Sequence, residues 1–599
     1  MRGLEFLGHK LARRAAWAFA VSLIVVGAHA GTAQPAVTFL PQNWSGADRD
    51  AFYTTSQGSR IMPFAWFQAL RHADGQPLLA DGLARYGYLA NTRSPTNPQG
   101  LPVGFTLDTR TGQPYLGMTC AACHTRQIEV AGQIYRIDGG PAIVDFEALL
   151  RDIRSAVRTV LADADTSPAF GTFAHAVLGS GDTPPARIAL RLEVTQWFAG
   201  YDAILRGALP AQDWGLARID AVGMIFNRVA GLDLDIPANI RPADAPVRYP
   251  FLWDASRQDK TQWPGFAQNG LDVLAMGRNV GEVLGVFAWF HPTGGLLPAP
   301  DGARHVEYLR GSSPDFAGLQ KLETTIRSLG SPKWPAAWPI RSDLQARGQQ
   351  VFNERCAQCH GEREAAVPGT WQTPVRNVGT DPKEWNNLQA MSASGVLRES
   401  RQPPFIGDRL KDPDTTKNVL ANAVVGTVLE DLWQNALPTS KRKADGVWQA
   451  VDSDLHRLGP EEVNIQSTDI QSADTDTVLE HLNERLKDLF NHNADDPGAA
   501  YEARVLHGVW AAAPYLHNGS VPTLAELLKP AAKRVRSFKV GAQYDPVAVV
   551  LAVDQGPFSS TYVVGDCAGM SGNGNCGHEY GTDLSVDDRS ALLEYLKQL

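Results

Sequence analysis

The stretch LGMTCAACHTRQIEV, residues 116–130, contains the motif Cys-x-x-Cys-His, and the same motif returns in VFNERCAQCHGEREA, residues 351–365. Two thiols on one turn can add to the two vinyl groups of a porphyrin, and the adjacent His then lies under the iron as an axial ligand. We therefore interpret the motifs as attachment sites for two covalently bound haem c groups. The thiols are those of Cys120, Cys123, Cys356 and Cys359, and the iron ligands are His124 and His360.

Two other interpretations of the motif are weaker. A redox dithiol would be expected in a βαβ context, which neither segment shows, and zinc would need four convergent ligands at each site. The chain has six Cys in all, and four of them belong to these two motifs.

The first thirty residues have the pattern of a secretory signal peptide. Arg2, Lys10, Arg13 and Arg14 are positive, residues 15–26 are apolar, and Ala28-His29-Ala30 is a small-residue cleavage site. An uncleaved anchor is the alternative, although the apolar run is short for a bilayer. We expect a periplasmic or secreted protein, and no later stretch is apolar enough to predict an integral membrane span.

Composition and charge limit the possible partners. A chain of 599 residues predicts two to four domains, and its composition is that of a globular protein. The net charge of −9 argues against a nucleic-acid partner, because no basic surface is indicated.

The predicted fold class is mainly α, with two c-type cytochrome-like haem domains, long irregular connections and few short strands. Apolar residues at three- and four-residue spacing predict helices at 146–161 and 190–205. Further helices are predicted at 342–352, before the second motif, and at 585–599, where Ser585 is the N-cap. The predicted organisation is a signal peptide at 1–30, an N-terminal haem c domain at 31–335 and a C-terminal haem c domain at 336–599. A proline-rich linker falls at 328–339, and the polar stretch 440–500 is interpreted as a surface insertion.

The second axial face of each iron decides its function, because a strong ligand there gives an electron-transfer haem and an open face admits O₂ or peroxide. His517 and His578 lie in Gly- and Pro-rich frames that indicate fixed loops. Cys567 and Cys576 bracket a loop just before His578, and in an oxidising compartment we expect them to form a disulfide. Met570, inside that loop, is the competing ligand.

Several segments together resemble the bacterial diheme cytochrome c peroxidase superfamily. The general match rests on the two haem motifs, PYLHNGSVPTL (514–524) and the closing LSVDDRSALLEYLKQL (584–599). A closer resemblance is to its oxygenase branch, which holds the diheme rubber oxygenases and the diheme unsaturated-fatty-acid dioxygenases. The segments that carry it are FYTTSQGSRIMPFAWF (52–67), GLPVGF (100–105), LGMTCAACHTRQIEV (116–130), IDGGPAIVDF (137–146), APVRYPFLWDASRQDKTQWPGF (245–266), RNVGEVLGVF (278–287) and GNCGHEYGTDLS (574–585).

The resemblance implies roles for residues of this chain. The C-terminal haem would be ligated by His360 and His578, with His517 as a supporting group near it. The N-terminal haem would have His124 on its proximal side and would bind O₂ on the other. Its apolar distal pocket would come from the segment between the haems, with Phe251, Trp253, Trp263 and Phe266 as the candidate residues.

The nature of that pocket separates the candidate activities. A peroxidase needs a polar distal side with a base, for which Glu282 is the candidate, although it could instead pair with Arg278 one helical turn away. A dioxygenase acting on an apolar chain needs a dry pocket, which the aromatic segment favours. We therefore expect insertion of O₂ at or next to a C=C bond of an unsaturated lipid.

A fatty acid such as oleate, giving a hydroperoxide, is the preferred substrate, with Arg248 or Arg257 as a partner for its carboxylate. The alternatives are oxidative cleavage of polyisoprene, a fatty-acid hydroperoxide isomerase that makes diols, a diheme cytochrome c peroxidase and a pure electron carrier. Besides the substrate and O₂, a small redox protein is a possible partner.

Overall fold

The computed structural model of the chain describes residues 36–162, 168–270, 272–295, 302–365, 367–401, 408–435 and 498–599. The predicted signal peptide lies outside these ranges, as does almost all of the insertion predicted at 440–500. The chain from Val37 to Leu599 forms one compact unit. The domain boundary predicted between residues 335 and 336 stays a prediction.

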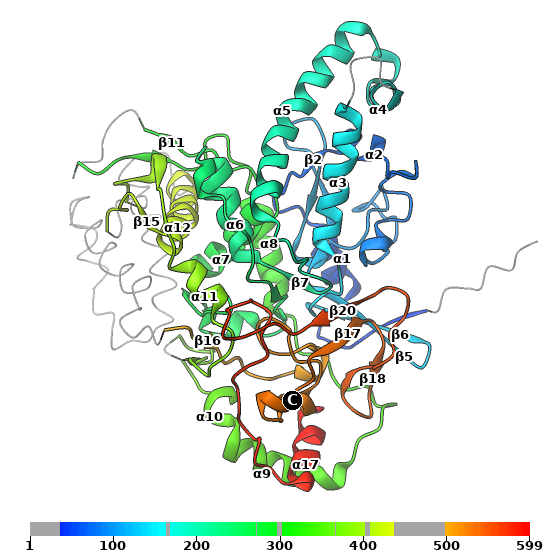
Figure 1. Cartoon of the computed structure of the whole chain (residues 1–599), viewed down its shortest axis with the longest axis vertical. Coiled ribbons are helices and arrows are strands. Elements are labelled where there is room, and N and C mark those ends of the chain that lie inside the picture. The colour runs from blue at the N-terminus through cyan, green and yellow to red at the C-terminus, as the bar shows by residue number, and fades with distance from the viewer. Residues whose placement is uncertain are drawn as a thin grey trace, which may run out of the picture. The chain divides into compact units, whose positions relative to one another are not determined.

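The fold is mainly helical, as the sequence predicts, and its strands are short (Figure 1). The helices of nine or more residues are α1 (Gly46–Thr54), α3 (Phe146–Leu161), α4 (Pro168–Leu178), α5 (Pro184–Ala208), α7 (Asp272–Gly285), α8 (Phe316–Arg327), α9 (Gln345–Arg355), α12 (Thr416–Asn435) and α17 (Val586–Leu596). The shorter ones are α2 (Phe64–Ala69), α6 (Ala221–Phe226), α10 (Ala357–His360), α11 (Lys383–Leu388) and α16 (Leu524–Leu527). No helix in the described ranges is both long and apolar enough to cross a membrane.

Local sequence signals account for the predicted helices. α3 has the predicted bounds, and its N-cap Asp145 accepts a hydrogen bond from the backbone N–H of Ala148 at 2.9 Å. α5 contains the helix predicted at 190–205 and extends it in both directions. α17 begins after Ser585, whose hydroxyl accepts from the N–H of Asp588 at 3.0 Å. The first prediction is confirmed with its bounds and the second as part of a longer helix, whereas the third is confirmed at its start but the helix ends at Leu596.

Two three-stranded sheets precede and follow the first haem motif. One has the order β1 (Val37–Phe39), β6 (Gln133–Asp138), β5 (Thr125–Val130), with β1 parallel and β5 antiparallel to β6. The other has the order β2 (Met62–Pro63), β4 (Tyr115–Met118), β3 (Phe105–Asp108) and is antiparallel. The first motif joins β4 to β5, so both sheets fix its ends.

Short strand pairs connect distant parts of the chain. The pairs that matter for the site are β7 (Arg218–Ile219) with β8 (Val247–Arg248), and β13 (Val375–Arg376) with β16 (Tyr501–Glu502). A third pair, β17 (Ser537–Gly541) with β20 (Ser559–Val563), packs near the C-terminal loop. Each brings segments that are tens to more than a hundred residues apart in sequence into contact.

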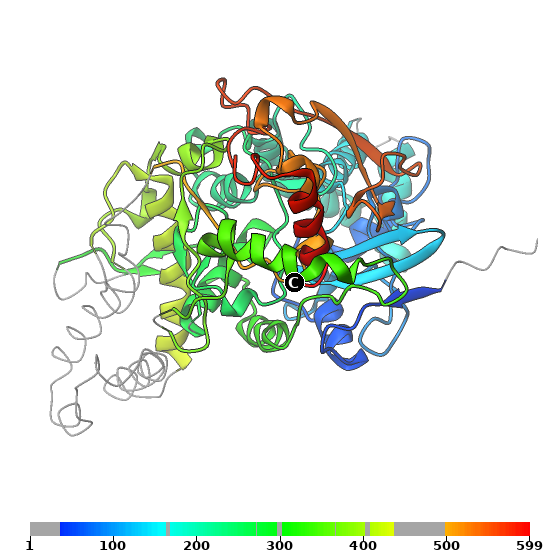
Figure 2. The same cartoon turned by 90° about the horizontal axis from the view of Figure 1, so that it is seen from below.

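The second haem motif is supported by a pair of helices. α9 leads into the motif and packs against α17, and both views show the two helices side by side (Figure 2). The rings of Phe352 and Tyr595 lie 5.5 Å apart in this interface. Arg347 and Asp588 add an ion pair of 2.6 Å at its edge. In the region predicted to resemble a small cytochrome domain, the helix that leads into the haem motif therefore packs against α17.

Candidate functional site

The first Cys-x-x-Cys-His motif forms a single tight turn. The N–H groups of Cys123 and His124 both donate to the carbonyl of Cys120, at 3.2 and 3.0 Å, so the two thiols and the imidazole project from one turn. Gly104, with a φ of +79°, lies directly behind it, and a Cβ there would come within 2.0 Å of the Ala122 nitrogen. Gly104, in the segment GLPVGF, therefore packs directly against the backbone of the motif.

His124 is held in one orientation and is uncharged. Its Nδ1 is 2.8 Å from the carbonyl oxygen of Pro250, which orients the ring, and within the described residues Nε2 makes no hydrogen bond. Burial lowers the pKa of His124 to about 4, so the imidazole is uncharged at neutral pH. A neutral, oriented imidazole is the form that binds a metal.

The second motif has the same construction on a helix. The N–H groups of Cys359 and His360 donate to the Cys356 carbonyl at 3.0 and 2.9 Å, where α9 ends and α10 begins. His360 Nδ1 is 2.7 Å from the carbonyl oxygen of Arg504, and burial lowers its pKa. Both motif histidines are thus oriented by a backbone carbonyl from a distant segment.

His578 faces His360. The centres of the two rings are 6.2 Å apart and their planes are inclined by 47°. Two metal–nitrogen bonds of about 2 Å, together with the radius of each ring, would place opposed imidazoles roughly 6 Å apart. His578 Nδ1 is buried without a hydrogen-bond partner in the described part of the chain. Burial and the neighbouring His360 lower the pKa of His578 to about 4. The pair fits the two axial ligands of one haem iron.

A rigid loop positions His578. The N–H of His578 donates to the Val378 carbonyl at 2.8 Å, and a Cβ on Gly577 would come within 2.3 Å of the Gly379 carbonyl carbon. Cys567 and Cys576 are joined by a disulfide just upstream. Met570 lies exposed on the same loop, away from the residues that face His360. Of the two candidate ligands on this loop, His578 is therefore the one that faces His360.

His517 lines the same cavity as His360 and His578, which we call the second cavity. Its ring stacks on Tyr501, with centres 3.8 Å apart and planes inclined by 13°. Burial lowers the pKa of His517 to about 3. The structure thus places it beside the C-terminal haem site, where the sequence predicts a supporting role.

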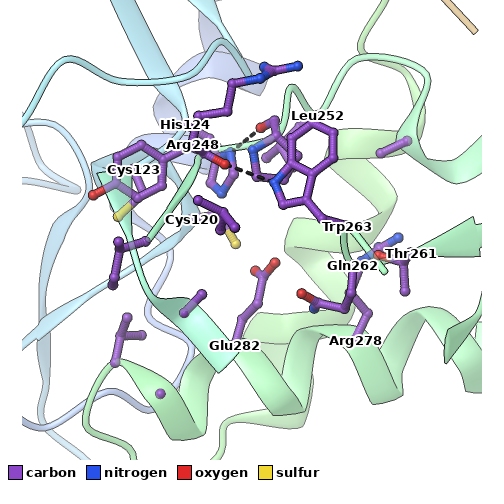
Figure 3. Close-up of a pocket in the computed structure, with 18 of the residues that line it drawn as sticks. Cys120, Cys123, His124, Arg248, Leu252, Thr261, Gln262, Trp263, Arg278 and Glu282 are labelled. Atoms are coloured by element: carbon purple, nitrogen blue, oxygen red, sulfur yellow. Dashed lines mark hydrogen bonds between the residues drawn. The ribbon is translucent and has the colours of Figure 1, made fainter. Parts of the chain in front are cut away.

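The first cavity is lined by Cys120, Cys123 and His124 and lies over α7 (Figure 3). Among its described lining residues His124 is the only histidine, and the two thioethers are those of Met118 and Met224. An apolar part of the lining comes from α6, α7 and the segments beside them. Its residues are Ile219, Ala221, Met224, Ile225, Leu252 and Val286.

Glu282 enters the first cavity from α7, across the gap from Cys120 (Figure 3). Burial raises the pKa of its carboxyl group. The alternative predicted from sequence, a pair with Arg278, does not form, because Arg278 is ion-paired with Glu323 instead. Within the described residues Glu282 has no ion pair. Because its carboxyl group lines the cavity, the lining is not uniformly apolar.

Two of the four predicted pocket aromatics line the cavity, and two do not. Phe251 and Trp263 line the first cavity, but they also line the second. Trp253 stacks behind Phe251, with ring centres 4.7 Å apart, and donates to the His507 carbonyl at 2.7 Å. Phe266 packs against the apolar cluster that includes α7 and α12. The four aromatic residues are close together in the sequence, but their rings do not all point into the first cavity.

Some residues line both cavities and form a wall that the two cavities share. They are Arg248, Phe251, Trp263, Glu502 and Arg504. The predicted cation Arg248 is among them, whereas Arg257 is exposed and lies 3.8 Å over the Trp371 ring. Sequence reasoning missed Glu502 and Arg504. Their signal was the charged pair in YEAR (501–504), shortly before PYLHNGSVPTL.

Both sites fit a c-type haem. Each offers two free thiols and a neutral histidine on one turn beside a cavity, and the second also offers His578 as an opposed ligand. The residues that would hold the first haem are Cys120, Cys123 and His124. Those that would hold the second are Cys356, Cys359, His360 and His578.

Two family models match the chain, both in its C-terminal half. A model described as cytochrome c matches residues 345–412, which include the second haem motif. A model described as RoxA-like, cytochrome c-like matches residues 500–539, which include Glu502, Arg504 and His517. These matches support a haem c oxidoreductase with a covalently bound haem. The presence of two haems stays a prediction.

Two proteins of Sinorhizobium fredii (strain NBRC 101917 / NGR234) are similar to this chain. The uncharacterized protein y4iJ is 30% identical over 628 residues, which cover 94% of this chain and 93% of that protein. The uncharacterized protein y4iM is 36% identical over 272 residues, or 44% of this chain and 46% of that protein.

Proposed function

The chain belongs to the family of the Sinorhizobium fredii protein y4iJ, and from this premise we propose that it is an exported diheme c-type oxygenase. In this proposal the N-terminal haem site is the catalytic one and the C-terminal site transfers electrons. The substrate is an unsaturated lipid, with a fatty acid such as oleate preferred. Both atoms of O₂ enter the product, which is a hydroperoxide.

The observation that best supports this proposal is that the two sites differ in what lies opposite their motif histidines. His360 has an opposed imidazole in His578, whereas the described lining opposite His124 contains no second histidine. A saturated iron suits electron transfer and an open one suits reaction with O₂ or peroxide. Haem c, when bound, supplies the one-electron and O₂ chemistry.

The chain's own residues would orient the substrate and exclude water. Met224, Ile225 and Val286 offer an apolar surface against which an acyl chain can lie. Leu252 and Phe251 extend that surface toward the shared wall. Burial of these side chains against a lipid chain displaces water from the reacting double bond, which favours oxygen insertion over side reactions.

Glu282 favours a second candidate, a diheme peroxidase. A carboxylate across the cavity from His124 could take a proton from H₂O₂ and return it to the leaving oxygen. The absence of an ion pair to Glu282 within the described residues leaves its carboxyl group available for that role.

One experiment separates these activities. Haem-loaded protein is supplied with oleate, linoleate or polyisoprene, O₂ uptake is recorded, and products are identified by mass spectrometry. We expect uptake with oleate and a product heavier by two oxygen atoms. Diols formed from an added hydroperoxide would identify an isomerase, and carbonyl-ended isoprene fragments a rubber oxygenase. No uptake, together with rapid H₂O₂ turnover, would replace the oxygenase by the peroxidase.

A further inference from the structure

Arg534 is a buried arginine whose guanidinium donates to five main-chain carbonyls. A guanidinium has five N–H groups in one plane, so each of them can have an acceptor here. The acceptors, with their distances from the donating nitrogens, are the carbonyl oxygens of Leu527 (3.2 Å), Lys529 (3.1 Å), Asn575 (2.6 Å), Gly577 (2.8 Å) and His578 (3.0 Å). Glu526 and Glu579 act on its charge, but within the described residues neither forms an ion pair with it. Main-chain carbonyls therefore hold this side chain.

The five carbonyls belong to two segments that are far apart in the sequence. On one side, Leu527 is the last residue of α16 and lines the second cavity together with Leu524 and Leu528. On the other side is the loop that carries His578. The guanidinium of Arg534 thus ties one wall of the second cavity to the loop that presents the opposed histidine.

Two of the carbonyls belong to the peptide groups on either side of the His578 Cα. The Gly577 carbonyl is in the preceding peptide, whose N–H donates to the Val378 carbonyl at 2.8 Å, and the His578 carbonyl is in the following one. The orientations of these two planes define φ and ψ of His578, so Arg534 fixes the direction in which the imidazole leaves the main chain. The φ of His578 is +50°, a value that is uncommon for a residue with a Cβ and that surrounding contacts must maintain.

The ring of His578 lacks the hydrogen bond that orients the two motif histidines. Nδ1 of His124 is 2.8 Å from the carbonyl oxygen of Pro250, and Nδ1 of His360 is 2.7 Å from that of Arg504. Such a bond commonly sets the orientation of a metal-binding imidazole. Nδ1 of His578 is buried without a partner in the described part of the chain. The orientation of this ring therefore depends on the contacts that hold its main chain.

We propose that Arg534 is a positioning residue that keeps His578 opposite His360 and so closes the C-terminal haem to external ligands. It acts through the main chain, because its hydrogen bonds go to carbonyls and not to either imidazole. A lysine side chain has three donors and a glutamine side chain two, so neither can hold five carbonyls. The inference rests on the proposed electron-transfer role of the C-terminal haem, for which both axial positions are filled.

The test measures how many equivalents of CO the reduced, haem-loaded protein binds per chain. We expect one in the natural protein and a second in Arg534→Gln, whose two donors cannot replace the five of the arginine. The apparent affinity of the C-terminal haem for CO should rise by about tenfold or more, as expected for the loss of several hydrogen bonds. The absorption spectrum of the ferric protein should show a matching loss of the six-coordinate signal. Arg534→Lys, with three donors, should lie between the two.

Two controls separate positioning from charge and from stability. Lys533→Gln removes the exposed cation on the preceding residue. Arg228→Gln removes another buried arginine, which donates to the Ala288 carbonyl at 3.0 Å and lines neither cavity. Both variants should bind one equivalent of CO, even where denaturant unfolding shows that Arg228→Gln is less stable than the natural protein.

His578→Ala is the reference for an open C-terminal haem, and it separates the failure of this inference from that of the proposed function. A second equivalent of CO in His578→Ala, without one in Arg534→Gln, would overturn the role of Arg534 and leave the proposed function intact. If Arg534→Gln does not fold, Arg534→Lys decides in the same way. An equal opening in Arg228→Gln would also overturn that role, because lost stability alone would then release the ligand. Unchanged CO binding in His578→Ala would overturn both the role of Arg534 and the proposed closed haem.

Discussion

The imidazole rings of His360 and His578 face each other across the second cavity, with their centres 6.2 Å apart. Arg504 orients the first ring through its backbone carbonyl, and the loop that begins at the Cys567–Cys576 disulfide carries the second. In the first cavity, His124 has an equally fixed ring but faces α6 and α7 rather than another imidazole. The two haem motifs are alike in sequence and differ in what lies opposite them.

Replacing His578 should open the C-terminal haem. In His578→Ala we expect that haem to become five-coordinate and to bind CO, so that the protein binds CO at both haems rather than at one. CO difference spectra of the reduced protein measure this, with haem content as the check on attachment. Met570→Leu is the control on the same loop and should leave the spectrum unchanged. A shift in Met570→Leu without one in His578→Ala would assign the ligand to the thioether.

Removing the disulfide should loosen the loop that carries His578. For a ring of about ten residues, chain entropy predicts a loss of roughly 2–3 kcal/mol in the double variant Cys567→Ser, Cys576→Ser. Because the loop ends one residue before Gly577, we also expect exogenous imidazole to displace His578 at lower concentration. Denaturant unfolding and imidazole titration measure the two effects. Identical curves for variant and natural protein would show that the Val378 and Gly577 contacts hold the loop alone.

What the sequence could predict is mostly local. The helix at Phe146–Leu161 follows from apolar spacing, and the start of α17 follows from the capping hydroxyl of Ser585. The tight turn of each haem motif is likewise set by five consecutive residues. These features need no knowledge of distant parts of the chain.

The contacts that could not be predicted join distant segments. A one-turn pair between Arg278 and Glu282 is reasonable on a helix, but Glu323 of α8 takes the arginine. Phe251 and Trp253 are two residues apart, yet of the two only Phe251 lines the first and second cavities. The spacing of apolar residues in one sequence predicts helices and strands. It does not predict which side chains of an irregular segment point toward a given cavity.

A pair of phenylalanines tests the position of the substrate. Phe251 lines the first cavity and Phe266 does not, so Phe251→Leu should lower kcat/KM for oleate by roughly tenfold, as expected for lost apolar contact. Phe266→Leu should leave it within about twofold. O₂ uptake at several oleate concentrations gives the values, in protein with unchanged haem content. Equal losses in the two variants would place the acyl chain elsewhere.

Glu282 distinguishes the two candidate activities. If it serves as a base toward H₂O₂, Glu282→Gln should lose about 10²- to 10⁴-fold in peroxidase turnover. Because burial raises the pKa of Glu282, the natural protein should gain this activity only as the pH rises through that raised value. The variant should show no such rise. O₂ uptake with oleate should change little, and its complete loss would give Glu282 a role in oxygenation.

Asp220 should make the stability of the protein depend on pH. Its carboxylate caps α6 by accepting from Gly223 N–H at 2.8 Å, and it also accepts from Ala245 N–H at 3.0 Å. Burial raises the pKa of Asp220 to about 7, above its value in the unfolded chain. Between about pH 4 and pH 7 the folded state therefore keeps a proton that the unfolded state has lost, and stability falls as the pH rises.

Asp220→Asn should remove this contribution. The amide keeps one acceptor and loses the other, which costs about 1 kcal/mol at every pH, so the slope is the measurement that matters. At 1.36 kcal/mol per pKa unit, the free energy of unfolding should fall by a few kcal/mol less between pH 4.5 and 8 than in the natural protein. Denaturant unfolding at several pH values measures it, with the exposed Asp74→Asn as control. A slope that Asp220→Asn leaves unchanged would mean that Asp220 is ionised in the folded protein at all these pH values.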